Sequence, residues 1–137
     1  MVEIHVNYLG GLHCEVTHGP SGQTFLTDAP LDNQGKAEFI SPTDLAAASI
    51  GSCILTIMGI SANTSGFNID GAKVTVLKEM MNQPYRRIKK LTLNFTFPRQ
   101  YSEKEEHIIK EVIKRCPVTK SLHPDIEMEA NYIFNEE

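Results

Sequence analysis

The sequence predicts an α+β fold in which mainly antiparallel sheets surround a buried central helix. The expected elements follow the order β-β-β-α-β-β-α-β, without the regular strand–helix alternation of a doubly wound parallel sheet. The first long helix is apolar nearly all round, which indicates burial on most of its sides. The length of 137 residues suits a single domain over residues 1–137, with a core large enough to need no disulfide or metal.

Three short strands are expected at the start of the chain. Residues 2–9 alternate apolar and polar side chains with a period of two, the pattern of an edge or half-buried strand. A Gly-Gly turn leads to a second strand over residues 12–17, and a Gly-Pro-Ser-Gly turn leads to a third over residues 23–27. These strands and turns predict an antiparallel meander.

The segment Ser41-Pro-Thr-Asp44 predicts the start of the long helix. Serine suits the N-cap, proline suits the first helical position, and Asp44 lies three residues after the cap, as in a capping box. The helix is expected to run from Pro42 to about Thr64, with Gly66 as its stop. A helix this apolar in a domain this small suggests a shared core, so we infer a homodimer.

The second half of the chain predicts two long strands, a helix and a last strand. The first strand covers residues 72–81, and the next alternates apolar and polar side chains over residues 91–97. A capping box at Ser102 begins a helix whose apolar stripe ends at Cys116, directly before Pro117. The last strand alternates again, over residues 126–134.

Composition excludes several classes of function. A net charge of -4 and an isoelectric point near 5.7 argue against a nucleic-acid-binding protein. The longest apolar stretch is broken by serine, glycine and threonine, so no membrane span is expected, and no signal peptide opens the chain. Three cysteines do not make a disulfide framework. We therefore expect a cytoplasmic protein with working thiols.

Cys53 lies in the middle of the long helix and faces an apolar surface that includes Ile50 and Ile57. Most such cysteines act as small buried hydrophobic residues. The start of the helix is too far away to lower the pKa of this thiol. If Cys53 reacts as a thiolate, a side-chain cation has to stabilise it.

Cys116 ends the stripe of the second long helix and precedes Pro117, where the backbone N–H groups of the next turn can come close. Core packing explains it equally well. If both helices present their thiols inward, Cys53 and Cys116 could form a redox pair. The sequence alone does not place the two residues within disulfide distance.

A metal site is not expected from local spacing. Cys14 lies beside His13, with His18 four residues further on, but neither a C-x-x-C nor an H-x-x-x-H pattern occurs. The sequence leaves the role of Cys14 open. It contains no dinucleotide-binding or phosphate-binding glycine motif either, so no cofactor is expected.

Several stretches together resemble the OsmC/Ohr family of osmotically inducible and organic hydroperoxide resistance proteins. They span most of the chain in the order that the family keeps, with the helical cysteine and the Cys-Pro segment at the family's thiol positions. The stretches are Tyr8-Leu-Gly-Gly-Leu-His-Cys14, His18-Gly-Pro-Ser-Gly22, Thr27-Asp-Ala-Pro30, Phe39-Ile-Ser-Pro-Thr-Asp-Leu45, Ile50-Gly-Ser-Cys53 and Cys116-Pro-Val-Thr-Lys-Ser-Leu-His-Pro-Asp-Ile126.

The resemblance implies an OsmC-like fold, an intertwined homodimer with central helices between sheets, and a thiol-dependent peroxidase. In the implied chemistry, Cys53 attacks an organic hydroperoxide as a thiolate and becomes a sulfenic acid. Cys116 then condenses with it to a disulfide, and an external dithiol, such as a lipoyl-type reductant, restores both thiols. An apolar mouth around Cys53 would favour organic hydroperoxides over hydrogen peroxide.

The sequence departs from the family pattern at the group that stabilises the thiolate. Family members place an arginine near the Gly-Gly turn and hold it with a glutamate, whereas the first arginine here is Arg86. His13, Arg86 or Arg87 are the candidate replacements, His13 only when protonated. Asp44 stands near the family's glutamate but is about 180° from Cys53 on a continuous helix, and capping explains it without catalysis.

Two other functions remain open at this point. One is an OsmC-like dimer that binds a small apolar ligand, its peroxidase activity weak or lost together with the arginine. The other is a structural dimer whose cysteines belong only to the core. Titration of free thiols after one equivalent of an organic hydroperoxide separates these possibilities, because only a peroxidase loses two of its three thiols quickly.

Overall fold

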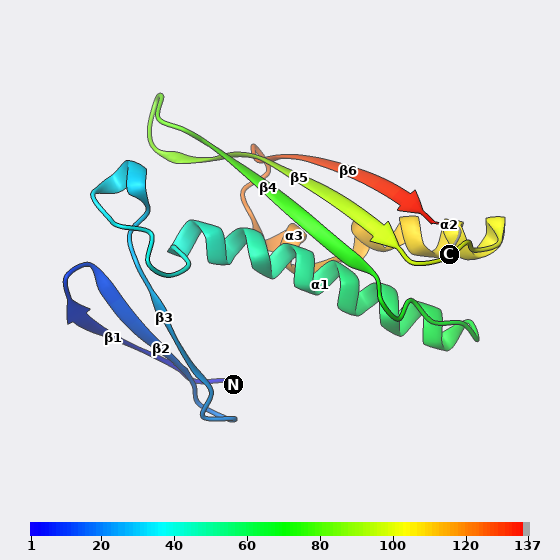
Figure 1. Cartoon of the computed structure of the whole chain (residues 1–137), viewed down its shortest axis with the longest axis horizontal. Helices are drawn as coiled ribbons and strands as arrows, with labels where there is room; N and C mark the ends of the chain where they lie inside the picture. Colours follow the sequence, from blue (N-terminus) through cyan, green and yellow to red (C-terminus); the bar gives the residue numbers. More distant parts are fainter. Residues whose placement is uncertain (136–137) are drawn as a thin grey trace. The chain divides into compact units, whose positions relative to one another are not determined.

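The computed structural model describes residues 1–135 and divides the chain into two compact units, one over Met1–Ala46 and one from Ala47 onward. Figure 1 shows the elements of both units in chain order. Each unit is described by itself. The expected α+β class is confirmed, whereas the single domain over residues 1–137 stays a prediction.

The first unit contains the expected three-stranded meander. Strands β1 (Ile4–Gly10), β2 (His13–His18) and β3 (Thr24–Thr27) form an antiparallel sheet in the order β1-β2-β3. The Gly-Gly turn adopts positive φ angles of 90° and 62°, which glycine tolerates without steric cost. A short 3-10 helix, η1 (Leu31–Asn33), lies in the following loop and is not apparent in the sequence.

One face of this first sheet is apolar and exposed. Val6 pairs with Val16, and Val16 pairs with Phe25, so these side chains lie on the same face. Val6 is 59% exposed, and Ile4 on the same face is 61% exposed. A hollow of about 400 Å³ lies on this face. We refer to Ile4, Val6, Tyr8, Val16 and Phe25 as the apolar sheet face.

The long helix α1 (Pro42–Thr64) has the predicted bounds. Ser41 Oγ accepts the Asp44 N–H at 3.1 Å, and the Ser41 N–H donates to the Asp44 carboxylate at 3.3 Å, so the capping box forms as expected. Only one stripe of the helix is fully buried within the chain: Ala47, Ile50, Gly51, Ile54, Met58 and Ala62. Burial on most sides would therefore require further contacts beyond those within the chain.

By length and composition alone, α1 would be able to cross a membrane. The core helix of a water-soluble protein meets the same criterion, so a single such helix is weak evidence for a span. Its buried stripe packs on protein, at the crossing with strand β4 (Lys73–Met81). A Cβ atom placed on Gly51 would lie 3.0 Å from Val76 and 3.1 Å from Val74.

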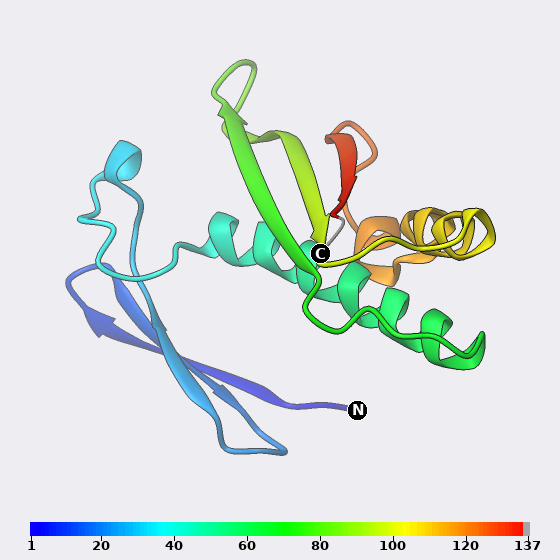
Figure 2. The same ribbon diagram turned by 45° about the vertical axis from the view of Figure 1, so that its right-hand side comes forward.

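The second unit contains a mixed three-stranded sheet in the order β4-β5-β6. Strand β5 (Arg87–Phe97) pairs antiparallel with β4 and parallel with β6 (Glu127–Phe134). Pairing over the described residues is thus mainly antiparallel, as predicted, with one parallel pair that the sequence did not indicate. Figures 1 and 2 show α1 running along this sheet.

The core of the second unit lies between its sheet and its helices. Alternate residues of β5 are buried, and Phe95 stacks on Tyr132 and Phe97 on Phe134 across the parallel pair, with ring centroids 5.2 and 4.8 Å apart. Ile109 and Val112 contribute fully buried side chains from the helical segment opposite. The predicted period of two in β5 and the predicted helical stripe therefore meet in one core.

The predicted second long helix is divided into three short elements. Helix α2 (Glu103–Glu111) begins with the expected capping box at Ser102 and continues as a 3-10 turn, η2 (Val112–Arg115). A new short helix, α3 (Pro117–Ser121), follows with Cys116 as its N-cap. From its position, Pro117 could either end the preceding helix or begin a new short turn. In the structure it begins a new turn.

Candidate functional site

The second unit brings two thiols together. Cys53 comes from the middle of α1, and Cys116 comes from the junction between η2 and α3. Both are free thiols, and a hydrogen bond between their side chains affects the pKa of each. The structure therefore brings the two residues that the sequence suggested as a pair close enough for each thiol to shift the pKa of the other. Cys14 is the remaining cysteine and lies in the first unit.

Cys116 is the thiol whose negative charge is stabilised. Burial alone raises its pKa, but hydrogen bonds outweigh burial and hold the pKa of Cys116 below its ordinary value. The Thr119 main-chain N–H donates to Cys116 Sγ at 3.3 Å. The Thr119 hydroxyl, which is otherwise buried without a partner, the Cys53 thiol and the Val118 N–H contribute to the same shift.

Cys53 is the thiol of the pair whose pKa is raised. Burial raises it first, and the interaction with Cys116 raises it further, while the Val118 N–H acts in the opposite direction. Cys116 is therefore the sulfur of the pair that ionises more readily. This order differs from the expectation that Cys53 itself is ionised. Cys53 is nevertheless the more accessible of the two, because Cys116 is fully buried.

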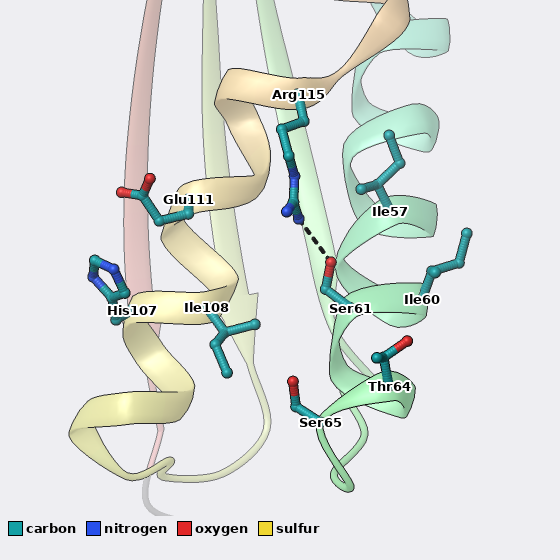
Figure 3. A pocket seen from close by; sticks show the side chains of 9 residues that line it. All are labelled: Ile57, Ile60, Ser61, Thr64, Ser65, His107, Ile108, Glu111 and Arg115. Atoms are coloured by element: carbon teal, nitrogen blue, oxygen red, sulfur yellow. Dashed lines mark hydrogen bonds between the residues drawn. The ribbon is translucent and has the colours of Figure 1, made fainter.

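A cavity of about 550 Å³ lies between α1 and the segment formed by α2 and η2 (Figure 3). Ile57, four residues after Cys53 on the same face of α1, lines it together with Ile60 and with Ile108 of α2. Arg115, the neighbour of Cys116, reaches across the cavity and donates to Ser61 Oγ at 2.8 Å. The Arg115 guanidinium group is therefore hydrogen-bonded to a residue that lies about two helical turns after Cys53 on α1.

The predicted supporting residues of the second unit are engaged elsewhere. Arg86 donates to Asn82 Oδ1 at 3.4 Å in the β4–β5 turn, and Arg87 donates to the main-chain carbonyl of Ile88 at 3.0 Å. None of the leading contributions to the thiol pKa values comes from a cation. The roles of Arg86 and Arg87 at a thiolate stay predictions. Any role of Asp44 beyond the helix cap that it forms also stays a prediction.

His13 lies in the first unit between two carboxylates. Its Nε2 atom is 3.5 Å from Asp28 Oδ2 and 3.3 Å from Glu38 Oε1. The pKa of Asp28 is lowered, mainly because the Glu38 N–H donates to its carboxylate. Burial acts in the opposite direction, and the Ala29 N–H and the nearby His13 lower the pKa further. The role of His13 as a cation for the thiol pair stays a prediction.

Sequence reasoning did not identify Thr119 and Val118 as functional residues. Their signal was nevertheless present, because Cys116-Pro-Val-Thr119 has the spacing of an N-cap followed by proline at the first helical position. Cysteine is not a usual N-cap residue, so the pattern is easily taken for a helix end. Asp28 gives no such signal, because Glu38, one of its hydrogen-bond partners, is ten residues away in sequence and meets it only in the folded loop.

The family model for OsmC-like proteins matches residues 35–131 of the chain. A crystal structure of a proposed osmotic stress induced and detoxification response protein from Psychrobacter arcticus 273-4 is 40% identical, with a TM-score of 0.90 over 96% of each chain. The organic hydroperoxide resistance protein OhrB of Bacillus subtilis is 15% identical, with a TM-score of 0.72 over 96% of this chain and 97% of its own.

A third solved structure with this fold is an organic hydroperoxide resistance protein OsmC from Legionella pneumophila, also described as a predicted redox protein. It is 15% identical and has a TM-score of 0.75 over 97% of this chain and 96% of its own. No curated protein matches the sequence significantly.

Proposed function

Because the chain belongs to the OsmC-like protein family, we propose that it is a thiol-dependent peroxidase that reduces organic hydroperoxides in defence against oxidative stress. The observation that carries the proposal is the closeness of Cys53 and Cys116, whose thiols shift each other's pKa in opposite directions. Two neighbouring sulfurs, one of which ionises more readily, are the arrangement that a two-cysteine peroxidase needs, since one sulfur is oxidised and the other resolves it.

The proposed reaction begins with a proton transfer within the pair. Cys116 accepts the proton of Cys53, and the Cys53 thiolate attacks the hydroperoxide, so that a sulfur–oxygen bond forms and the O–O bond breaks. Cys53 becomes a sulfenic acid, and the departing alkoxide takes the proton back from Cys116 to leave as an alcohol. The Cys116 thiolate then displaces hydroxide from Cys53 and forms the disulfide.

The proposed substrate is an organic hydroperoxide because the approach to Cys53 is partly apolar. Ile57, Ile60 and Ile108 line the neighbouring cavity and can remove an alkyl group from water, which stabilises a bound alkyl chain by about 0.8 kcal/mol for each buried CH₂. Hydrogen peroxide offers no such group. The cavity thus supports a preference for substrates with an apolar substituent.

The remaining requirements are proposals of the same kind. An external dithiol, such as a lipoyl-type reductant, reduces the Cys53–Cys116 disulfide by thiol–disulfide exchange, and no bound cofactor takes part. The protein acts as a cytoplasmic homodimer without a nucleic-acid or membrane partner. The exposed apolar sheet face supports the dimer, because a second copy would remove that face from water.

Consumption of cumene hydroperoxide in the presence of a dithiol tests the proposal. We expect Cys53→Ser to abolish turnover and Cys116→Ser to slow it strongly, because the dithiol then has to reduce the Cys53 sulfenic acid directly. Cys14→Ser is the matched control and should retain the wild-type rate. Unchanged turnover in Cys53→Ser would remove the peroxidase from consideration.

A second candidate function is supported by the absence of a cation among the leading influences on the thiols. In this alternative the dimer binds a small apolar ligand and the cysteines are structural or vestigial. Thiol titration after one equivalent of cumene hydroperoxide distinguishes the two, since the peroxidase loses Cys53 and Cys116 rapidly, whereas the binding protein keeps all three thiols.

A further inference from the structure

The first unit gathers one imidazole and two carboxylates from three different segments. His13 is the first residue of β2, Asp28 directly follows β3, and Glu38 lies in the loop before α1. Nε2 of His13 and one oxygen of each carboxylate all lie within 4.8 Å of one another. We call these three residues the His13 cluster.

The imidazole nitrogen at the centre of this cluster lacks a hydrogen bond. Nε2 of His13 is buried and has no partner with acceptable hydrogen-bond geometry, although carboxylate oxygens lie 3.3 and 3.5 Å away. A buried polar atom in a native protein normally has a partner. Nε2 therefore has no hydrogen bond to lose if a further group lies between the three atoms.

Two of the three separations in the cluster fit a metal ion. Ligands at the 2.0–2.2 Å typical of zinc–nitrogen and zinc–oxygen bonds are about 3.3–3.6 Å apart when they occupy two corners of a tetrahedron. The His13–Glu38 and His13–Asp28 separations of 3.3 and 3.5 Å fall within that interval. Imidazole and carboxylate are also the ligands that divalent first-row metals accept.

Neighbouring groups hold two of the ligands in place. The Ala29 N–H donates to Asp28 Oδ1 at 2.7 Å and the Glu38 N–H donates to Oδ2 at 3.0 Å, which fixes the carboxylate and leaves each oxygen a further lone pair. The ring of Phe39 contacts the His13 ring edge-on, with centroids 5.6 Å apart. Such supporting contacts orient ligands in metal sites.

A cavity of about 310 Å³ adjoins the cluster and gives it an opening. Gly11, Leu12 and Gln34 line it beside the three ligands, so a fourth coordination position can face water or a small molecule. Lys36 also lines the cavity, and its charge opposes a bound cation. The two carboxylates outweigh that single positive charge, so the local charge remains negative with a neutral imidazole.

We propose that His13, Asp28 and Glu38 bind a divalent first-row metal ion, zinc in the first place, and that this ion ties β2 and the end of β3 to the loop before α1. The local spacing patterns that made a metal site unexpected are irrelevant here, because the ligands are 10 to 25 residues apart and meet only in the folded unit.

Calorimetric titration with zinc tests the proposal in the full chain carrying Cys53→Ser and Cys116→Ser, so that the thiol pair does not bind the metal. We expect one zinc ion per chain and a higher melting temperature, because a ligand that binds only the folded state stabilises it. Cobalt should give the absorption bands of a tetrahedral site without a thiolate charge-transfer band.

Three variants in that background identify the ligands. His13→Ala and Glu38→Gln should each weaken zinc binding by at least about tenfold, the least expected even for loss of an outer-shell partner. His5→Ala, an exposed histidine of β1 that pairs with Glu3, is the matched control and should bind as tightly as the parent. Glu38→Gln is the more informative variant, because the Glu38 side chain is 52% exposed and its replacement should leave the fold intact. Absence of zinc binding by the folded parent would overturn the proposal, and so would equal binding by both variants.

Discussion

The two thiols of the pair have unequal tasks because their surroundings differ. Cys116 is fully buried, yet it faces the N–H groups of Thr119 and Val118 and the Thr119 hydroxyl, all of which favour its thiolate. At Cys53, burial and the neighbouring Cys116 outweigh the Val118 N–H and raise the pKa of the thiol. In this account Cys116 acts first as the proton acceptor of Cys53 and later as the resolving thiolate.

Thr119→Val tests this assignment through the pH dependence of turnover. The pKa of Cys116 lies below its ordinary value, so activity is present above that pKa and is lost as the pH falls through it. Loss of the hydroxyl raises the pKa of Cys116 and moves the acid limb of the pH profile upward. On the acid limb the rate should fall by about tenfold, the effect of about 1.4 kcal/mol.

Thr119→Ser is the matched control for that experiment, because it keeps the hydroxyl and the main-chain N–H. Its acid limb should coincide with that of the wild type. An unchanged acid limb in Thr119→Val would show that the hydroxyl does not stabilise the Cys116 thiolate.

At the level of elements, α1 connects the thiol site to the sheet that supports it. Gly51 lies two residues before Cys53 and meets Val74 and Val76 of β4 at the closest approach of helix and strand. A side chain here would push the helix away from the sheet, since packed interiors have little free volume. The position of Cys53 therefore depends on a small residue at position 51.

Gly51→Ala and Gly59→Ala should change stability in opposite directions. Alanine is favoured over glycine within a helix by about 1 kcal/mol, and at Gly59 nothing lies within 4 Å of the added Cβ, so Gly59→Ala should stabilise the protein. At Gly51 the new Cβ meets valine methyl groups at 3.0 and 3.1 Å, and such overpacking typically costs about 1–3 kcal/mol. Urea unfolding measures both changes.

Equal stabilisation by both alanines would contradict the close approach of α1 to β4. If Gly59→Ala destabilised the protein as much as Gly51→Ala, the close approach would be contradicted as well. The loss of stability would then not depend on contact with the sheet.

Local sequence signals predicted the elements where they are strong. Ser41-Pro-Thr-Asp44 fixed the start of α1, and the alternation over residues 91–97 identified β5, because capping and side-chain periodicity act within a few residues. The parallel pairing of β5 with β6 was not predicted, since pairing is decided by tertiary packing. The 3-10 turn before Cys116 was not predicted, and the new turn at Pro117 was predicted only as an alternative to a simple helix end.

The candidate site was predictable to a different extent. The resemblance to the family paired Cys53 with Cys116, and the structure brings the two together, but sequence periodicity alone left their distance undetermined. The His13 cluster was not predictable, because His13, Asp28 and Glu38 have no fixed spacing and are joined by the conformation of a loop. Distant residues that meet through loops leave no periodic signal.

The apolar sheet face of the first unit is an exposed apolar surface. Tyr8 is 67% exposed, and its apolar neighbours Ile4 and Val6 on β1 are about equally so. An apolar surface of this kind is typical of an interface, and a second copy of the chain is the partner that we propose. The long helix α1, with only one stripe buried within the chain, supports the same proposal.

Val6→Glu should convert the proposed dimer to a monomer, because a carboxylate would be buried without a partner in the interface. Sedimentation or light scattering at micromolar concentration measures the mass. His5→Glu is the matched control, since it adds the same charge to the opposite face of the same strand. A wild-type mass equal to one chain, or an unchanged dimer in Val6→Glu, would contradict the proposed interface.

The central claim is that Cys53 and Cys116 act as one redox pair. Peptide mass mapping of the wild-type protein, quenched immediately after one equivalent of cumene hydroperoxide, measures this directly. The account predicts a disulfide between the peptides that contain Cys53 and Cys116, formed within the turnover time, while Cys14 stays reduced. Recovery of both peptides with free thiols, or a disulfide that involves Cys14 instead, would contradict it.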